Sequence, residues 1–363
     1  MNKTIKVLHT EWSDGWGGQE IRIIGEMLAV REQGVEVFLA CRDHATIKKK
    51  ALEHGIKVFT LPFRGNADIK TLLALKNIIK EHDIDIVNTH SGKDTWVGGL
   101  AAKFAGVKFI RTRHLSNRIR SSRTNFINEL ADYIFTTGES VRADMIKYNR
   151  IKPERIKSIP TGIDADVFNP ELYDRSSCRK LFSLKEDEIA IGIVAVLRQF
   201  KRHDLFLQMA KALVERYPNK KLVFLIAGDG PQKNSIVSLV QQVGLDKQVR
   251  LLGYVTQVPE LLMALDIFVL SSDSKEGVPQ SVMQALLMDK AVVSTDSGST
   301  RDLLYQNNFQ LVKVNSVDSL FKGVDYCLSH SKNKNSREFI MLNFSKTAMT
   351  KKISNAYKFF LGV

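Results

Sequence analysis

Residues 190–228 read AIGIVAVLRQFKRHDLFLQMAKALVERYPNKKLVFLIAG, and this stretch decides the fold. It begins and ends with short apolar runs rich in valine, isoleucine and leucine, which are typical of buried strands. Between the two runs, residues 201–216 place their apolar side chains at helical spacing. A strand, a helix and a second strand in this order predict two parallel strands joined by a crossover helix.

The same alternation runs through the rest of the chain. Residues 5–10, IKVLHT, form a strand-type run, and residues 19–33 follow with helical spacing. A polar stretch at 160–187 separates this series from a second one. Short strands that alternate with amphipathic helices are typical of a parallel sheet covered on both faces. We therefore expect an α/β protein with two domains: residues 1–175, joined by a C-terminal helix at 346–363, and residues 176–345.

The composition restricts the classes of protein to consider. With 44% hydrophobic and 25% charged residues, the chain of 363 residues has the make-up of a globular protein. Three scattered cysteines predict free thiols in a reducing compartment. The N-terminus does not resemble a signal peptide, and no apolar run reaches roughly 18 residues, so we expect a cytoplasmic protein that spans no membrane. A net charge of +14 indicates an anionic partner: nucleic acid, an acidic membrane surface or a phosphorylated substrate.

Ligands of open parallel sheets bind beyond the carboxyl ends of the strands, so the loops after the strands are the candidate sites. Gly17 and Gly18 follow the first strand and allow a ligand to approach the backbone closely. In the second half of the chain, Arg198 and Lys201 follow one strand-type run, and Gly228 ends the next. Because these strand ends belong to one sheet, we expect two cations and exposed backbone amides to gather there.

A third strand end of the same sheet leads into EGVPQSVMQALL, residues 276–287. Pro279 suits the first helical position, so the N–H groups without a partner in the helix would be those of Gln280, Ser281 and Val282. Glu276 lies just outside this positive helix end, in a corner that makes a poor capping box. Phosphates would bind the amides and the two cations, and hydroxyl groups would bind Glu276. A nucleotide diphosphate sugar has both kinds of group.

The chain resembles a retaining glycosyltransferase of family 4 in the segments SSDSKEGVPQSVMQAL, LRQFK, AGDGP, IPTGIDADVF (159–168) and, in the N-terminal half, GGQE. It also resembles bacterial members that build surface polysaccharide or lipopolysaccharide in the segment RTRHLS, residues 111–116. The resemblance implies the GT-B fold, in which two Rossmann-like parallel-sheet domains face a central cleft. The N-terminal domain would bind the acceptor and the C-terminal domain the nucleotide sugar.

The resemblance also implies roles for individual residues. Glu276 would contact hydroxyls of the donor sugar, and Gln284 stands where the family has a second glutamate that holds the ribose. Arg198 lies two places after the family's phosphate-binding arginine and would take its role, with Lys201 at the family's lysine position. His114 would lie near the donor sugar and complete the catalytic set. The other implied donor contacts are Gly17, Gly18, Gly228, Tyr254, Gly277, Gln280, Ser281 and Val282.

The implied reaction moves a hexose or N-acetylhexosamine from a nucleotide diphosphate sugar to a glycan or lipid-linked acceptor, in cell-surface polysaccharide or lipopolysaccharide synthesis. UDP-sugars are favoured as donors. No cofactor is expected, because cations and helix amides can stabilise the leaving diphosphate. No metal is expected either: the two DxD triplets, at 83–85 and 164–166, precede a strand and lie in the linker. His9, His90 and His114 lie near strand ends but lack the spacing of metal ligands.

A basic run in the first domain consists of Arg111, Arg113, Arg118, Arg120 and Arg123. This run is either a solvated surface or a contact for the anionic inner face of a membrane or for a phosphorylated lipid acceptor. No nucleic-acid-binding motif accompanies it, so we expect no nucleic acid partner.

Three other functions are compatible with parts of the pattern. An epimerase or hydrolase of nucleotide sugars shares the fold but depends on further carboxylates and histidines in the cleft. A two-lobed sugar-binding protein without catalysis is usually exported, whereas this chain shows no signal peptide. An NAD-dependent oxidoreductase requires a compact GxGxxG turn followed by an acidic residue, and the first strand–helix loop offers neither.

Overall fold

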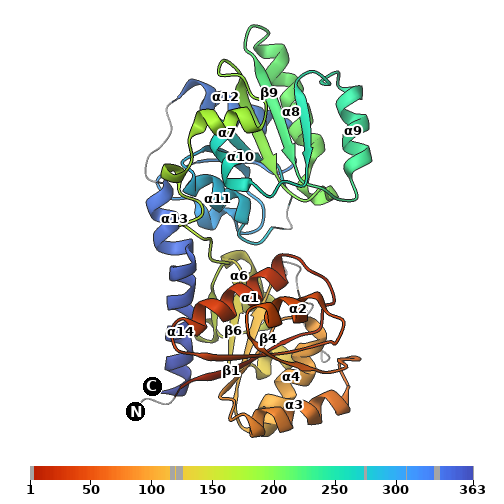
Figure 1. Cartoon of the computed structure of the whole chain (residues 1–363), viewed down its shortest axis with the longest axis vertical. Coiled ribbons are helices and arrows are strands. Elements are labelled where there is room, and N and C mark those ends of the chain that lie inside the picture. Colours follow the sequence, from red (N-terminus) through yellow and green to blue (C-terminus); the bar gives the residue numbers. More distant parts are fainter. Residues whose placement is uncertain are drawn as a thin grey trace. The chain divides into compact units, whose positions relative to one another are not determined.

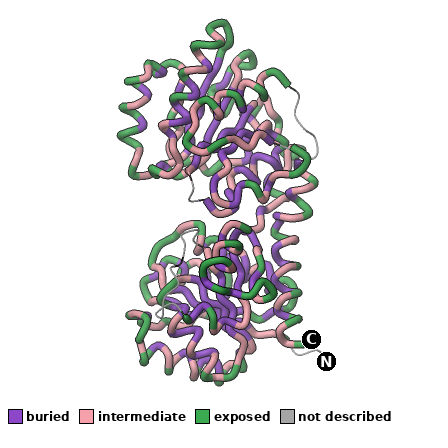
Figure 2. The backbone as a smooth tube through the Cα atoms, turned by 180° about the vertical axis from the view of Figure 1, so that it is seen from behind, coloured by how far each residue is buried: buried purple, intermediate pink, exposed green. Residues whose placement is uncertain are grey.

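The computed structural model describes residues 4–114, 119, 126–273, 276–307, 309–330 and 336–362 (Figure 1). The chain forms two compact units, one from Met1–Gly162 and Lys346–Val363 and the other from Ile163–Ser345. Each unit is built around its own parallel sheet, which confirms the predicted α/β class. In both units the strands are mostly buried, and the helices that cover them are partly exposed (Figure 2).

Within the described residues, the sheet of the first unit has seven parallel strands in the order β3-β2-β1-β4-β5-β6-β7. They are β1 (Lys6–Glu11), β2 (Glu36–Cys41), β3 (Lys57–Thr60), β4 (Ile86–Thr89), β5 (Lys108–Arg113), β6 (Tyr133–Thr136) and β7 (Ile156–Ser158). The strand order reverses between β1 and β4, which pair directly. Ligands of such sheets bind beyond the carboxyl ends of the strands at this reversal.

Helices cover both faces of the first sheet. They are α1 (Gly18–Arg31), α2 (Thr46–Glu53), α3 (Ile69–Glu81), α4 (Gly92–Ala105), α5 (Ile127–Leu130), α6 (Glu139–Asn149) and α14 (Lys346–Leu361), with a 3-10 turn η1 (Pro153–Arg155). The C-terminal helix α14 contacts α1 and buries Met349, Ile353 and Tyr357 in the same core. Its apolar residues recur every three or four positions, so one helical face is buried.

Within the described residues, the second sheet has six parallel strands in the order β10-β9-β8-β11-β12-β13. They are β8 (Ile189–Val194), β9 (Leu222–Ala227), β10 (Val249–Gly253), β11 (Ile267–Leu270), β12 (Ala291–Thr295) and β13 (Gln310–Val312). The strand–helix–strand unit predicted from residues 190–228 is confirmed: β8 and β9 pair in parallel and are joined by a helix, α8. The strand order reverses between β8 and β11.

The second sheet is also covered by helices on both faces. They are α7 (Arg175–Leu181), α8 (His203–Arg216), α9 (Lys233–Gln242), α10 (Val258–Ala264), α11 (Gln280–Leu287), α12 (Val317–Ser329) and α13 (Ser336–Phe344), with 3-10 turns η2 (Pro170–Leu172), η3 (Gln199–Lys201) and η4 (Thr300–Leu303). Apolar side chains of these helices and of the strands form one core on each face of the sheet.

The first unit ends at Gly162, before the boundary at residue 175 that the polar stretch suggested. Ile163 and Phe168 belong to the core of the second unit. Arg337 Nη1 donates hydrogen bonds to the carbonyl oxygens of Phe168 and Leu287, both at 2.6 Å. These contacts fix the segment after Gly162 to the second unit, although its sequence is polar.

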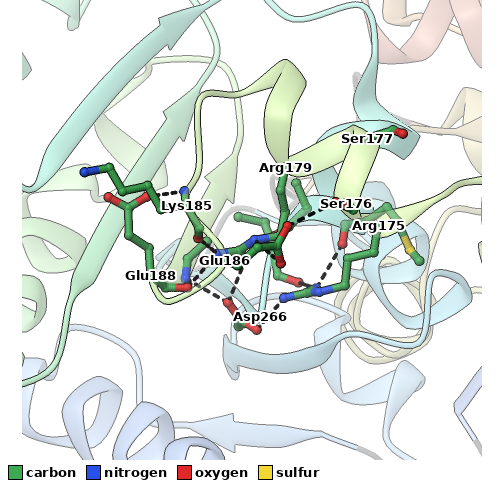
Figure 3. A network of polar contacts seen from close by, with 12 residues as sticks. Arg175, Ser176, Ser177, Arg179, Lys185, Glu186, Glu188 and Asp266 are labelled. Atoms are coloured by element: carbon green, nitrogen blue, oxygen red, sulfur yellow. Dashed lines mark hydrogen bonds and ion pairs between the residues drawn. The ribbon is translucent and has the colours of Figure 1, made fainter.

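A network of arginines attaches α7 to the same unit (Figure 3). Asp266, which precedes β11, accepts hydrogen bonds from Arg175 Nη2 at 2.8 Å and from the backbone N–H of Ala190 at 2.9 Å. The buried Arg179 donates to the carbonyl oxygens of Ala264 and Glu188, at 3.1 and 2.6 Å. A buried guanidinium needs acceptors for its donors, and these carbonyl oxygens satisfy the two terminal nitrogens, while Nε lies 3.9 Å from Glu186 Oε2.

All three cysteines are free, as the sequence indicated. None of the helices in the described ranges combines the length and apolar character that are needed to cross a bilayer.

Candidate active site

The loop after β8 is fixed to the end of β11 in the second unit. Ser271 Oγ donates hydrogen bonds to the carbonyl oxygens of Lys201 and Arg202, both at 2.9 Å. The backbone N–H of Asp273 donates to the carbonyl oxygen of Phe200 at 2.8 Å. Two strand ends that the sequence separates by about 70 residues therefore form one site, as expected at a switch point.

Lys201 and Glu276 form an ion pair at this site. Their side chains are 15% and 10% exposed, so the pair is largely removed from water. Ser272 Oγ donates a second hydrogen bond, at 2.6 Å, to the same carboxylate oxygen, Oε1 of Glu276. Charge-assisted bonds in such a position are strong, and breaking one partner leaves a costly buried charge. A ligand at this site must therefore replace the contact that each charge makes with the other.

The backbone of Glu276 is held by the loop after β12. Gly298 has a φ of +57°, and a Cβ at this position would lie 1.7 Å from the carbonyl oxygen of Glu276. The backbone N–H of Ser299 donates to the carbonyl oxygen of Gly277 at 3.3 Å. Only glycine allows this approach, so Gly298 determines where the carboxylate of Glu276 lies.

Helix α11 begins directly beyond Glu276. The sequence placed Pro279 at the first helical position, but Pro279 has the extended ψ of 118° and is the N-cap, so the helix begins one residue later. The first backbone bond of the helix runs from the N–H of Met283 to the carbonyl oxygen of Pro279, at 3.2 Å. The three preceding N–H groups have no acceptor within the helix and carry its positive end; they belong to Gln280, Ser281 and Val282. Gln284 lies half-buried one turn further on.

Gly228 and Tyr254 lie on the two neighbouring loops. The N–H of Gly228 donates to the carbonyl oxygen of Gly253 at 2.7 Å, and a Cβ on Gly228 would lie 1.9 Å from the carbonyl oxygen of Ala195. Gly228 thus packs the loops after β8, β9 and β10 together. Tyr254 is 79% exposed, which leaves its ring free to stack on a ligand.

Arg198 is exposed on the loop after β8 and lines a cavity of about 590 Å³. His203 and Asp273 line the same cavity. Burial lowers the pKa of His203 to about 4, so its ring is neutral at pH 7. The loop therefore presents Lys201 to Glu276 and Arg198 to this cavity.

In the first unit, Gly17 is the N-cap of α1 and Gly18 its first residue. The N–H of Gly17 donates to Glu20 Oε2 at 2.8 Å, so a ligand must displace Glu20 to reach it. The N–H of Gly18 has no acceptor within the helix. Of the two amides that the sequence offered to a diphosphate, Gly18 is the more accessible.

His114 follows β5 and contacts a second histidine, His90, which in turn contacts a third, His9. His114 Nε2 lies 3.0 Å from His90 Nδ1, and His90 Nε2 lies 2.9 Å from His9 Nδ1. In the part of the chain that the structure describes, no group of three or more histidine, cysteine or acidic residues is arranged to hold a metal ion. Two of the DxD carboxylates accept backbone hydrogen bonds: Asp85 Oδ2 accepts the N–H of Lys6 at 2.9 Å, and Asp164 Oδ1 accepts that of Asp166 at 3.1 Å.

The predicted basic surface is wrong for two of its arginines. Arg111 is 2% exposed and donates through Nη1 to the carbonyl oxygen of Thr89 at 3.2 Å. Arg113 is mostly buried as well, and burial lowers its pKa to about 10. Both lie on β5, an interior strand of the sheet, and because they are two residues apart their side chains point to the same face. Arg118, Arg120 and Arg123 lie outside the described residues.

Several residues of these sites were missed in the sequence. Ser271 and Ser272 directly follow a strand, which is a usable signal, but short polar residues at strand ends are common. Glu11 ends β1 and accepts the N–H of Ser13 at 2.7 Å and Gln19 Nε2 at 2.6 Å. Burial, with a smaller effect of Asp94, raises the pKa of Glu11 to about 7. Only the three-dimensional structure reveals that environment.

Solved structures show the same architecture. The chain matches a glycosyltransferase from Rickettsia africae with a TM-score of 0.89, at 19% identity over 99% of both chains. It matches Alr3699/HepE of Anabaena, solved in complex with UDP, with a TM-score of 0.82, at 18% identity over 97% of this chain and 99% of the other. The fold is therefore GT-B, as the resemblance implied.

Sequence comparisons identify the family. Residues 16–167 match the model described as Glycosyltransferase Family 4, and residues 174–340 the model described as Glycosyl transferases group 1. The chain is 26% identical to the UDP-Gal:alpha-D-GlcNAc-diphosphoundecaprenol alpha-1,3-galactosyltransferase of Escherichia coli, over 97% of this chain and 96% of that protein. The chain belongs to glycosyltransferase family 4, and the predicted enzyme class, a glycosyltransferase of polysaccharide assembly, is confirmed.

Replacing Gly298 by alanine tests how the carboxylate is positioned. Gly298→Ala should force the loop of Glu276 to move, because its Cβ would overlap a backbone carbonyl. Gly244→Ala is the matched control: Gly244 also has a positive φ, +72°, but no atom lies within 4 Å of its Cβ position. Backbone strain alone should lower the free energy of unfolding of the control by about 1–2 kcal/mol. Gly298→Ala should lower it by at least about 1 kcal/mol more, measured by urea unfolding. Equal losses would contradict the role of Gly298.

Proposed function

We propose that the protein transfers a hexose or N-acetylhexosamine from a nucleotide diphosphate sugar, UDP-sugars being favoured, to a glycan or lipid-linked acceptor in cell-surface polysaccharide or lipopolysaccharide synthesis. The observation that carries this proposal is the Lys201–Glu276 pair at the open N-terminus of α11. It places a cation, a carboxylate and unpaired amides at one switch point. The Escherichia coli relative, by its name, uses UDP-galactose and a diphosphoundecaprenol acceptor, which supports the choice of substrates.

The diphosphate of the donor binds Lys201 and the first amides of α11. Arg198 joins them by turning its side chain out of the cavity that it lines in this structure. Glu276, released from Lys201, accepts hydrogen bonds from the hydroxyls of the donor sugar. Gln284 hydrogen-bonds the ribose as a neutral amide, without the charge assistance that a carboxylate gives. Tyr254 and the backbone around it contact the base, and Gly228 and Gly277 keep the loops of the second unit close to the donor.

Catalysis depends on charge that develops on the leaving diphosphate. As the bond to the sugar breaks, the cations and helix amides stabilise the departing phosphate oxygens without reorganisation. The acceptor attacks from the same face, so the configuration at the anomeric carbon is retained. The reaction needs no metal ion, because these protein groups supply the positive charge that a divalent ion supplies elsewhere.

Lys201→Ala should lower the rate of sugar transfer at least about tenfold, since losing one such donor costs roughly 100-fold or more. Transfer is measured by nucleotide release in the presence of acceptor, with and without EDTA, and EDTA should leave the wild-type rate unchanged. Lys322→Ala removes an exposed lysine of α12 and serves as the control. A folded Lys201→Ala protein with the wild-type rate would remove this residue from the mechanism, and loss of activity in EDTA would contradict the metal-free reaction.

The base of the donor can be identified by thermal shift. At about 100 times its dissociation constant, a bound nucleotide sugar stabilises the protein by about 2.7 kcal/mol. We expect UDP-sugars to raise the melting temperature more than GDP- or ADP-sugars do. A larger shift with GDP-sugars would overturn the choice of UDP, and no shift with any of them would argue against donor binding.

If the acceptor is lipid-linked, the protein works at the cytoplasmic face of the membrane. Ile69 and Leu73 on α3, and Phe104 on the neighbouring α4, are 69%, 54% and 62% exposed. The exposed Lys70 and Lys80 lie on the same helix as the first two. Apolar side chains flanked by lysines suit the interface of an anionic bilayer.

Leu73→Glu should weaken binding to vesicles that contain anionic lipid, because it places a negative charge, which the lipid headgroups repel, on the apolar face. Leu172→Glu is the control, since Leu172 is 64% exposed in the second unit. Binding is measured by co-sedimentation with anionic and with neutral vesicles. Equal sedimentation with both kinds of vesicle, or no difference between the two variants, would defeat the membrane contact.

A further inference from the structure

Three histidines form a continuous chain at the switch point of the first unit. His9 lies on β1, His90 directly follows β4 and His114 directly follows β5. The N···N distances are 2.9 and 3.0 Å, and both ring pairs have centroids 5.2 Å apart. A centroid separation that exceeds the N···N distance by about two ring radii means that the rings meet edge to edge. Both contacts therefore have the geometry of hydrogen bonds.

The backbones that carry these rings are fixed. The N–H of His90 donates to Asp94 Oδ2 at 2.9 Å, and Asp94 also accepts a hydrogen bond from Thr10 of β1. The carbonyl oxygen of His114 accepts a hydrogen bond from Thr137 Oγ1 at 3.1 Å. His9 pairs in register with Asn88 of β4. The rings are thus held in line by three neighbouring strands.

All three rings are neutral near pH 7. Burial lowers the pKa of His9 to about 3. Burial also lowers the pKa of His90 and of His114 well below the usual value. Its two histidine neighbours lower the pKa of His90 further, followed by Arg111 and Arg22. For His114 the further lowering of the pKa comes from Arg22, Arg111 and Arg113. Each ring therefore carries one N–H and one bare nitrogen.

The proton count couples the three rings. Both contacts join an Nδ1 to an Nε2, and each hydrogen bond contains one proton. Three neutral rings supply three protons, so the third must lie at one end of the chain. It lies either on His114 Nδ1, with every ring in the Nδ1–H form, or on His9 Nε2, with every ring in the Nε2–H form. No mixed arrangement satisfies both bonds.

The inner end decides between the two forms. His9 Nε2 is buried and has no hydrogen-bond partner among the described residues. A buried N–H without an acceptor is rarer than a buried acceptor without a donor. His9 Nε2 is therefore the bare nitrogen, and all three rings carry their proton on Nδ1.

We propose that His9 and His90 are positioning residues that hold His114 in the Nδ1–H form, so that His114 Nδ1 offers a hydrogen-bond donor to a bound substrate. The contact with substrate rests on the proposed function, whereas the shared form of the three rings does not. Because His9 Nε2 has no partner among the described residues to which a proton could pass, the three rings fix the form of His114 and do not conduct protons.

The form of each ring can be read by NMR of the full-length protein labelled with ¹⁵N-histidine. Long-range ¹H–¹⁵N spectra at pH 7 should show Nδ1–H for His9, His90 and His114, each assigned by its asparagine variant. Two neighbouring rings in unlike forms, or all three in the Nε2–H form, would overturn the proposal. This result does not depend on whether the protein binds a nucleotide sugar.

Position 9 also permits a matched pair of variants. The amide of His9→Asn can still donate to His90 Nε2, so this variant should keep the Nδ1–H form and turn over the donor within about twofold of wild type. The carboxylate of His9→Asp can only accept, so His90 and His114 should change to Nε2–H, and turnover should fall about fivefold to tenfold as one donor is lost. His82 lies at the end of α3 and is not one of the three linked histidines, so His82→Asn controls for the loss of a histidine. It should change neither the form of the three rings nor the turnover of the donor.

The outcomes separate the two proposals. If His9→Asn and His9→Asp lower turnover equally, or if His114 changes form without any loss of turnover, the positioning role is overturned. If no nucleotide sugar is turned over by the wild type, the proposed function fails while the spectra still decide the form of the chain. Should His9→Asp fail to fold, the spectra of the wild type and of His9→Asn still test the inference.

Discussion

The candidate site of the second unit is organised around the ion pair between Lys201 and Glu276. Two opposite charges meet in a largely buried position, and a serine hydroxyl completes the contact. Each charge would be costly to leave alone there, so the pair persists until a ligand supplies a partner for both. A ligand that carries an anion and several hydroxyls can do this, whereas a purely anionic or purely neutral ligand leaves one charge unsatisfied. The pair therefore supports the proposal that the ligand is a nucleotide diphosphate sugar, which has both parts.

The sheet topology creates the conditions for that pair. In both units the strand order reverses beside the first strand, so loops distant in the sequence end at the same edge of the sheet. In the second unit, Ser271 fixes the loop of Lys201 and Gly298 fixes the backbone of Glu276. In the first unit, the corresponding edge of its own sheet carries the three linked histidines and the carboxyl group of Glu11, whose pKa is raised. Comparable topology therefore supports different chemistry in each unit.

Much of the fold could be predicted from the sequence, because strand and helix periodicities are local. The strand–helix–strand segment from β8 to β9 and the start of a helix near Pro279 both follow from the local sequence pattern, with an error of one residue at the helix start. The end of the first unit could not be located, because Ile163 and Phe168 pack through contacts with distant residues. The run of arginines that begins at Arg111 suggested either a solvated surface or a contact for an anionic lipid, whereas the interior strand β5 buries Arg111.

The candidate site was predictable where the chemistry is carried by unusual residues. Lys201, Glu276 and the amides of α11 could be selected because each departs from what packing alone requires. Ser272, Gly298 and the link between His9 and His90 could not, since serine, glycine and histidine at strand ends are common and their partners are set by the fold. The sequence did not indicate that the two central charges would bind each other.

A crystal structure of the protein soaked with a hydrolysis-resistant UDP-sugar tests the central claim most directly. The account predicts that the distance between Lys201 Nζ and Glu276 increases, with the lysine on a phosphate oxygen, the carboxylate on sugar hydroxyls and the diphosphate at the first turn of α11. An intact ion pair, with the nucleotide sugar bound elsewhere on the protein, would contradict it.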